Sequence, residues 1–226
     1  MRFGINTFLF FSPFTTKSTG WFKRFKQWGF DSVELPVEDP SHIDAARVKA
    51  ELDRHGLVCG SLCVVTAAGR DLRGTPREQK IGMDYFRALI DQMVILDCPS
   101  LIGPVYSVVG RAEAVPQSEY RQQWKTVVRN LKALTRYAED RGKQICLEPL
   151  NRFETDFINT CDQALQMIED VGSPALKVLL DTFHMNIEEK SLGNAIRAVG
   201  SRLCHLHACE NDRGAPGSGN VTWSEV

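Results

Sequence analysis

Short apolar runs alternate with longer segments of helical periodicity along this chain. The runs are continuously apolar rather than alternating in polarity, which is typical of strands buried on both faces of a parallel sheet. Segments with apolar residues at helical spacing lie between them, so the chain has the order strand, helix, strand. The seven runs cover residues 3–7, 32–35, 58–65, 100–105, 144–150, 178–181 and 203–208.

Two of the intervening segments predict long amphipathic helices. Over residues 118–141 the apolar side chains recur every three or four positions, Ser118 can cap the start and Gly142 can end the helix. Residues 76–96 carry a similar stripe. The stripe residues are Tyr120, Trp124, Val127, Leu131, Leu134 and Ala138 in the first segment, and Ile81, Tyr85, Leu89, Met93 and Leu96 in the second.

The alternation predicts an α/β fold, and the length indicates a barrel. A closed (β/α)8 TIM barrel takes about 250 residues, or roughly 30 for each strand-helix unit, so this chain has room for about seven units. Residues 222–225, Thr-Trp-Ser-Glu, form a capping-box pattern that predicts a helix after the seventh strand. We therefore expect a single domain over residues 1–226, a TIM-type barrel with seven strands present and the eighth strand-helix unit missing from this chain.

Charge and cysteine content exclude several classes of protein. The 27 basic and 28 acidic side chains give a net charge of −1, without the basic surface that nucleic-acid binding requires. The densest apolar run near the N-terminus, residues 8–11, is too short to span a membrane. The seven cysteines are an odd number without a Cys-x-x-Cys pair, which predicts reduced core residues and a cytoplasmic protein.

Polar groups close three of the predicted strands. Glu148 follows the fifth, Asp181 ends the sixth, and His205 and His207 lie on the seventh. Parallel strands of a barrel end at one face, so two carboxylates and an imidazole are expected to meet there. Hard or borderline divalent cations such as Mg²⁺ and Mn²⁺ prefer such an oxygen-rich mixed site. The pattern predicts a metal-dependent enzyme.

Each of these residues also has a purely structural explanation. Glu148 could cap a helix, and Asp181 before Thr182 is common helix-start chemistry. His205 and His207 have the same strand parity and both point inward. We expect His207, nearer the strand end, to be the ligand, and His205 to be a supporting or core histidine. Inward-facing Glu34 on the second strand is interpreted as a supporting hydrogen-bond partner.

Three motifs in the last third of the chain carry a family resemblance. They are Leu147 to Glu154 (LEPLNRFE), Leu180 to Glu189 (LDTFHMNIEE) and His205 to Gly219, in which Glu210, Arg213, Pro216 and Gly217 are the matching positions. The motifs resemble those of the ketose 3-epimerases of the D-tagatose and D-psicose type, within the xylose-isomerase-like TIM barrel superfamily. The resemblance covers essentially the whole chain and is weak before residue 100.

The resemblance implies a sugar epimerase that inverts C3 of a free ketose through an enediolate. It places a divalent metal, Mn²⁺ before Mg²⁺ or Co²⁺, on Glu148, Asp181 and His207, with a fourth ligand, a glutamate of the eighth strand, beyond Val226. It assigns the sugar hydroxyls to Glu154, His184 and Arg213. Chemistry agrees with a base role for Glu148, because C3 inversion removes a proton next to a carbonyl. Members of the family generally form homo-oligomers.

Other functions compete with this one. Another isomerase of the superfamily, such as a hydroxypyruvate isomerase or a sugar-phosphate epimerase, would use the same metal ligands. The glycine-rich stretch 211–220 is a weak phosphate-binding pattern, since Arg213 is its only cation. An inactive sugar- or metal-binding remnant is the alternative outside enzymes. A zinc-dependent abasic-site endonuclease is disfavoured by five histidines and the absence of a basic face.

Overall fold

Seven parallel strands form one continuously curled sheet in the computed structural model, which describes residues 2–226. The strands follow each other in sequence order, β1 to β7, and each pairs in parallel with the next. This confirms the seven predicted strands and the α/β barrel topology. The strands are β1 (Gly4–Asn6), β2 (Ser32–Val37), β3 (Val58–Val64), β4 (Ser100–Gly103), β5 (Gln144–Leu147), β6 (Leu176–Asp181) and β7 (Leu203–His207).

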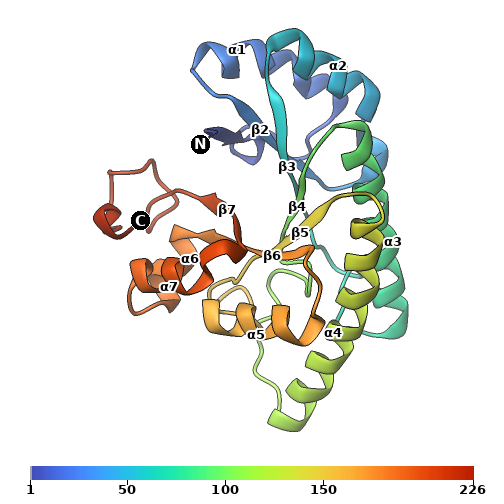
Figure 1. Cartoon of the computed structure of the whole chain (residues 1–226), viewed down its shortest axis with the longest axis vertical. Helices are drawn as coiled ribbons and strands as arrows, with labels where there is room; N and C mark the ends of the chain where they lie inside the picture. The colour runs from blue at the N-terminus through green and yellow to red at the C-terminus, as the bar shows by residue number, and fades with distance from the viewer. Residues whose placement is uncertain (1) are drawn as a thin grey trace.

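Helices follow the strands and cover the outer side of the curl (Figure 1). The two long predicted helices are confirmed as α3 and α4, but Ser118 does not cap α4, because the helix begins one residue earlier, after Pro116. Thr75 and Glu78 form a capping box at the start of α3, and Gly142, with φ of +63°, follows the end of α4. The helices are α1 (Phe22–Gln27), α2 (Ala45–His55), α3 (Pro76–Ile95), α4 (Gln117–Glu139), α5 (Cys161–Val171), α6 (Thr182–Glu188) and α7 (Leu192–Val199). Short 3-10 turns are η1 (Thr7–Leu9), η2 (Thr16–Trp21), η3 (Pro40–His42), η4 (Gly200–Arg202) and η5 (Trp223–Glu225).

The end of the described chain differs from its sequence prediction. Residues 222–225 do not form a capping box that opens an α-helix; Trp223–Glu225 is a 3-10 turn without a side-chain cap from Thr222. Instead the Glu225 carboxylate accepts hydrogen bonds from Ser191 Oγ at 2.9 Å and the Gly193 backbone N–H at 3.2 Å. The carboxylate therefore binds the N-terminus of α7, where a helix attracts negative charge.

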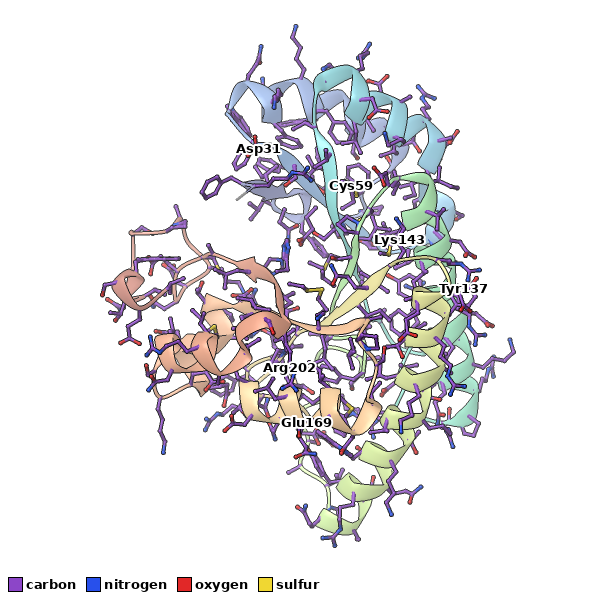
Figure 2. All side chains as sticks on the ribbon, viewed as in Figure 1. Asp31, Cys59, Tyr137, Lys143, Glu169 and Arg202 are labelled. Atoms are coloured by element: carbon purple, nitrogen blue, oxygen red, sulfur yellow. A yellow bond between two sulfur atoms is a disulfide. The ribbon has the colours of Figure 1, made fainter. Side chains whose placement is uncertain are left out.

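One part of the interior of the curl is apolar and contains three of the cysteines. Cys63, Cys146 and Cys204 lie together on β3, β5 and β7 with Ile102 and Leu179. Cys146 and Cys204 are joined by a disulfide, whose sulfur atoms are yellow in Figure 2. The prediction that all cysteines are reduced was therefore wrong for this pair. The reason is spatial, because the curl brings β5 and β7 together although 58 residues separate the two cysteines.

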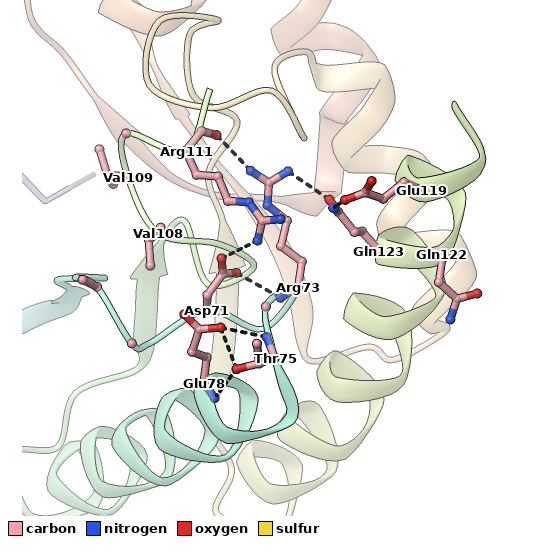
Figure 3. A pocket seen from close by; sticks show the side chains of 14 residues that line it. Asp71, Arg73, Thr75, Glu78, Val108, Val109, Arg111, Glu119, Gln122 and Gln123 are labelled. Atoms are coloured by element: carbon pink, nitrogen blue, oxygen red, sulfur yellow. Dashed lines mark hydrogen bonds and ion pairs between the residues drawn. The ribbon is translucent and has the colours of Figure 1, made fainter. Parts of the chain in front are cut away.

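Buried Arg73 ties together the loops that follow β3, β4 and β5, and Figure 3 shows its contact with the Arg111 carbonyl. Its guanidinium donates to Ser107 Oγ at 2.8 Å, to the Arg111 carbonyl at 2.8 Å and to Asp156 Oδ1 at 2.5 Å. A cavity of about 770 Å³ lies beside this network, between the β3–α3 loop, the β4–α4 loop and the start of α4. The charged groups of the network are paired with one another, which identifies it as a brace for these loops.

The brace extends to the loop that carries the predicted sugar-binding glutamate. The Gly110 N–H donates to the Glu154 carbonyl at 2.8 Å, and Arg111 forms a parallel bridge with Thr155. Arg73 thus helps to fix the position of the β5–α5 loop relative to the sheet.

Among residues 2–226, no helix has the length and apolar character that a membrane crossing requires.

We expect Arg73→Met to destabilise the fold by about 3 to 5 kcal/mol, because it leaves a largely buried carboxylate, Asp156, without its partner. The side chains of this pair are 0% and 10% exposed. Urea unfolding at pH 7 measures the loss. The control is Arg54→Met, which removes an exposed ion pair with Glu51 and should cost at most about 1 kcal/mol. Equal losses in the two variants would contradict a bracing role for Arg73.

Candidate metal and sugar site

The three predicted metal ligands meet at the carboxyl end of the sheet. Glu148 directly follows β5, and Asp181 and His207 end β6 and β7. His207 Nδ1 lies 3.5 Å from Asp181 Oδ2 and 3.7 Å from Glu148 Oε1. One ligand atom from each residue lies within 4.8 Å of the others, and both carboxylates are buried. A cation about 2.0 to 2.6 Å from each atom fits that spacing.

A third carboxylate lies on the other side of the His207 ring. Glu34, at the middle of β2 and buried, has both oxygens 3.1 Å from His207 Nε2. The same carboxylate lies 3.0 Å from His205 Nε2 and accepts from Asn6 Nδ2 at 2.7 Å and Ser61 Oγ at 2.8 Å. Glu34, on β2, therefore links β7 to β1 and β3 through its hydrogen bonds.

Two overlapping groups could hold a metal, and they share His207. One is Glu148, Asp181 and His207; the other is Glu34, His205 and His207. In the second group the carboxylate is already shared by both imidazoles and by Ser61 and Asn6. In the first group Nδ1 of His207 faces two carboxylates. With Nε2–H donated to Glu34, the neutral tautomer presents the Nδ1 lone pair to the first group, as a metal ligand must.

The charges of the site favour a cation at its centre. Burial disfavours the charged ring and lowers the pKa of His207, but the surrounding carboxylates, Glu34 first, outweigh it and raise that pKa well above its usual value. Burial raises the pKa of Asp181, but hydrogen bonding and the charge of His207 outweigh it and leave that pKa below its usual range. A divalent cation supplies the same positive charge, and its binding releases the His207 proton.

His184 points its second ring nitrogen toward the same place. Its Nδ1 accepts from the Asn151 backbone N–H at 3.0 Å, which assigns the ring proton to Nε2 in the neutral form. Nε2 lies 3.9 Å from Glu148 Oε1. His184, buried in α6, therefore presents an N–H donor beside the predicted base.

The other two predicted sugar-binding residues contact each other. Arg213 Nη2 donates to Glu154 Oε1 at 2.8 Å, and the guanidinium carbon lies 4.0 Å from the centre of the Phe183 ring. Asn151 Nδ2 also donates to Glu154 Oε1, at 3.0 Å, and lies 2.9 Å from His184 Nδ1. Asn151 thus connects His184 to Glu154, so that the predicted sugar-binding side chains form one hydrogen-bonded row.

Sequence reasoning missed part of this row. The contact between Phe183 and Arg213 was not predicted. The one indication in the sequence is that Phe183 lies two residues after Asp181, at the end of the sixth strand. The motif residue Arg152 does not enter the row; it pairs with Glu188 through two nitrogens, at 2.9 and 2.8 Å. Its guanidinium is held by Glu188 of α6, and its side chain is 63% exposed.

Comparison with known proteins agrees with this geometry. Residues 22–226 match the family model described as xylose isomerase-like TIM barrel. The chain is 30% identical over 238 residues to D-psicose 3-epimerase of Enterocloster bolteae, covering all of this chain and 76% of that protein. It is 31% identical to a probable ketose 3-epimerase of Synechocystis, covering 99% and 77% of the two chains.

A solved structure shows the same arrangement of strands and helices. The crystal structure of D-allulose 3-epimerase from Methylomonas, in complex with D-allulose, superposes with a TM-score of 0.91 at 29% identity. The match covers all of this chain and 77% of that one. The two relatives named above are ketose 3-epimerases by name, and the chain belongs to the xylose isomerase-like TIM barrel family.

Proposed function

We propose that this protein is a metal-dependent epimerase that inverts C3 of a free ketose. The observation that carries the proposal is the meeting of Glu148, Asp181 and His207 at one end of the sheet, beside a row of sugar-type hydrogen-bonding groups. The names of the matched relatives, D-psicose 3-epimerase and ketose 3-epimerase, support the same reaction. Mn²⁺ is the proposed metal, because two carboxylates and one imidazole suit a borderline divalent cation.

The proposed chemistry follows from where each residue lies. A bound divalent cation supplies Lewis-acid polarisation of the substrate's carbonyl and adjacent hydroxyl. Glu148 removes the C3 proton from one face, which leaves an enediolate, and inversion requires that a proton return on the opposite face. The Nε2–H of His184 lies within reach of a sugar oxygen next to Glu148. Asp181 and His207 hold the metal.

Glu154 and Arg213 are proposed to bind the hydroxyls at the far end of the sugar. Arg213 supplies a planar donor fork, and Glu154 accepts hydrogen bonds. Arg213 is the only cation in residues 211–220, and it is already paired with Glu154. A phosphate group would have to displace that carboxylate, so the arrangement favours a neutral sugar over a phosphorylated one. The cytoplasmic location and the homo-oligomeric state expected from the sequence remain predictions.

Metal removal is expected to abolish epimerisation of D-fructose, D-tagatose or D-ribulose, whichever the enzyme accepts. Dialysis against a chelator should eliminate product formation, and added Mn²⁺ should restore it. Asp181→Asn should weaken Mn²⁺ binding, measured directly by the electron paramagnetic resonance of free Mn²⁺, because it removes one anionic ligand. Full activity after exhaustive chelation would remove the metal from the mechanism.

Glu148→Gln is expected to slow exchange of the C3 proton with deuterated solvent by about a hundredfold or more, since the amide keeps the volume and one ligating oxygen but loses the basic lone pair. Proton NMR of the ketose in D₂O measures the exchange. His184→Ala and Arg213→Ala serve as comparison variants and should chiefly raise KM. Exchange at the wild-type rate in Glu148→Gln would assign the base to another residue.

Glu34→Gln is expected to weaken Mn²⁺ binding by about 10- to 100-fold, although Glu34 is not one of the three proposed ligands. The amide is a poorer partner for two imidazole N–H groups, so His207 loses the bond that orients Nδ1. Nitrogen-15 NMR of the metal-free protein, followed across pH, should show the His207 ring losing its second proton at lower pH than in the wild type, because the Glu34 charge that raises the pKa of this ring is gone. The control is Glu38→Gln, whose carboxylate accepts from Ser12 Oγ instead. Unchanged titration of His207 and unchanged Mn²⁺ affinity in Glu34→Gln would refute this role.

A further inference from the structure

The loop after β7 is built around one buried carboxylate that the proposed reaction does not use. Glu210 is fully buried. Its Oε1 accepts from the Gly217 N–H at 2.6 Å and from Trp223 Nε1 at 2.5 Å, and its Oε2 accepts from the Val221 N–H at 3.0 Å. Three segments of the loop, separated by up to 13 residues from Glu210, therefore bind to one side chain.

Two glycines allow the loop to close on this carboxylate. Gly217 donates its N–H with φ of +89°, a backbone conformation that glycine adopts without strain. At Gly219 a Cβ atom would lie 2.7 Å from Glu210 Oε2, which is closer than packing allows. Residues 211–220, the glycine-rich stretch that resembled a phosphate-binding pattern, thus fold around the Glu210 carboxylate, which accepts from the backbone N–H of Gly217.

The same residue holds both sides of Arg213 through its backbone. The Arg213 N–H donates to the Glu210 carbonyl at 2.9 Å, and the Glu210 N–H donates to the Gly214 carbonyl at 3.0 Å. Arg213 itself has φ of +64°, an unfavourable left-handed conformation for a residue with a side chain. The surrounding loop must stabilise that conformation, and it does so through the Glu210 turn.

This conformation directs Arg213 toward the site. Its guanidinium contacts Glu154, which belongs to the hydrogen-bonded row of predicted sugar-binding residues, and the Phe183 ring. Backbone N–H groups, that of Val221 first, and Trp223 Nε1 keep the pKa of Glu210 at about 2 against the opposing effect of desolvation. Glu210 is therefore an ionised acceptor across the pH range in which sugar enzymes are assayed.

We propose that Glu210 is a positioning residue, whose carboxylate organises the β7 loop so that Arg213 is presented to the ketose. The inference rests on the proposed function for its assignment of Arg213 to the sugar. Glu210 touches neither Glu148 nor His207 through any hydrogen bond in the described chain. Its effect should therefore fall on sugar binding rather than on metal binding or proton removal.

Glu210→Gln tests the proposal, because it keeps the volume and removes only the charge and one acceptor. Both carboxylate oxygens face N–H donors, so either orientation of the amide places its NH₂ group against a donor. We expect trypsin to cut the Arg213–Gly214 bond about tenfold faster, KM for the ketose to rise about tenfold, and kcat and Mn²⁺ affinity to stay within about threefold. The control is Glu169→Gln on α5, whose carboxylate is exposed (Figure 2).

Arg213→Ala, assayed in parallel, separates a failure of the positioning role of Glu210 from a failure of the sugar-binding role of Arg213. Faster cleavage at Arg213 together with a raised KM in Glu210→Gln supports the proposal. Unchanged cleavage in Glu210→Gln overturns the proposal. If Arg213→Ala raises KM, faster cleavage with an unchanged KM in Glu210→Gln also overturns it. If Arg213→Ala leaves KM unchanged, the proposed sugar-binding role of Arg213 fails, and the positioning role fails with it. Should Glu210→Gln not fold, Trp223→Phe removes a single donor and should show the same changes at smaller size.

Discussion

The hydrogen bond between His207 and Glu34 is the contact on which the site depends. It joins β7 to β2 across the interior of the curled sheet, between residues 173 positions apart. It also orients the imidazole, so that Nδ1 faces Glu148 and Asp181 while Nε2–H is donated. The same hydrogen bond thus holds β7 against β2 and fixes the orientation of a proposed metal ligand. A change in the curl of the sheet would change the site directly.

Burying three carboxylates around one imidazole is unfavourable unless positive charge accompanies them. In the chain itself the His207 proton supplies part of that charge, which is why the pKa of this histidine is raised. A divalent cation neutralises the cluster more completely. The same electrostatic requirement explains why Glu34 is so well provided with donors, from Asn6, Ser61 and both histidines. The cluster is stable only as a whole.

Two loop regions around the site also contain a buried charged side chain whose hydrogen-bonding groups are satisfied by its neighbours. Arg73 is a buried cation surrounded by acceptors from two other loops and from α4, and Glu210 is a buried anion surrounded by donors from one loop. Apolar packing holds helices and strands in place, whereas in these loops a buried ionised side chain holds the segments together through hydrogen bonds. Irregular loops expose many backbone polar groups, and a charged side chain satisfies several of them at once. Glu154 and Arg213, which these loops carry, therefore meet in a defined geometry.

Local patterns determined the elements of this protein, and the tertiary structure determined their partners. The periodicity of apolar residues predicted all seven strands and the two long helices, because each depends on contacts within a few residues. The positions of Glu148, Asp181 and His207 at strand ends predicted that they meet, since parallel strands end at one face. The disulfide from Cys146 to Cys204 and the bonds from Glu225 to α7 were not predictable. Nor was the loop around Glu210. These contacts depend on how far the sheet curls and where each loop returns, which no local pattern in the sequence records.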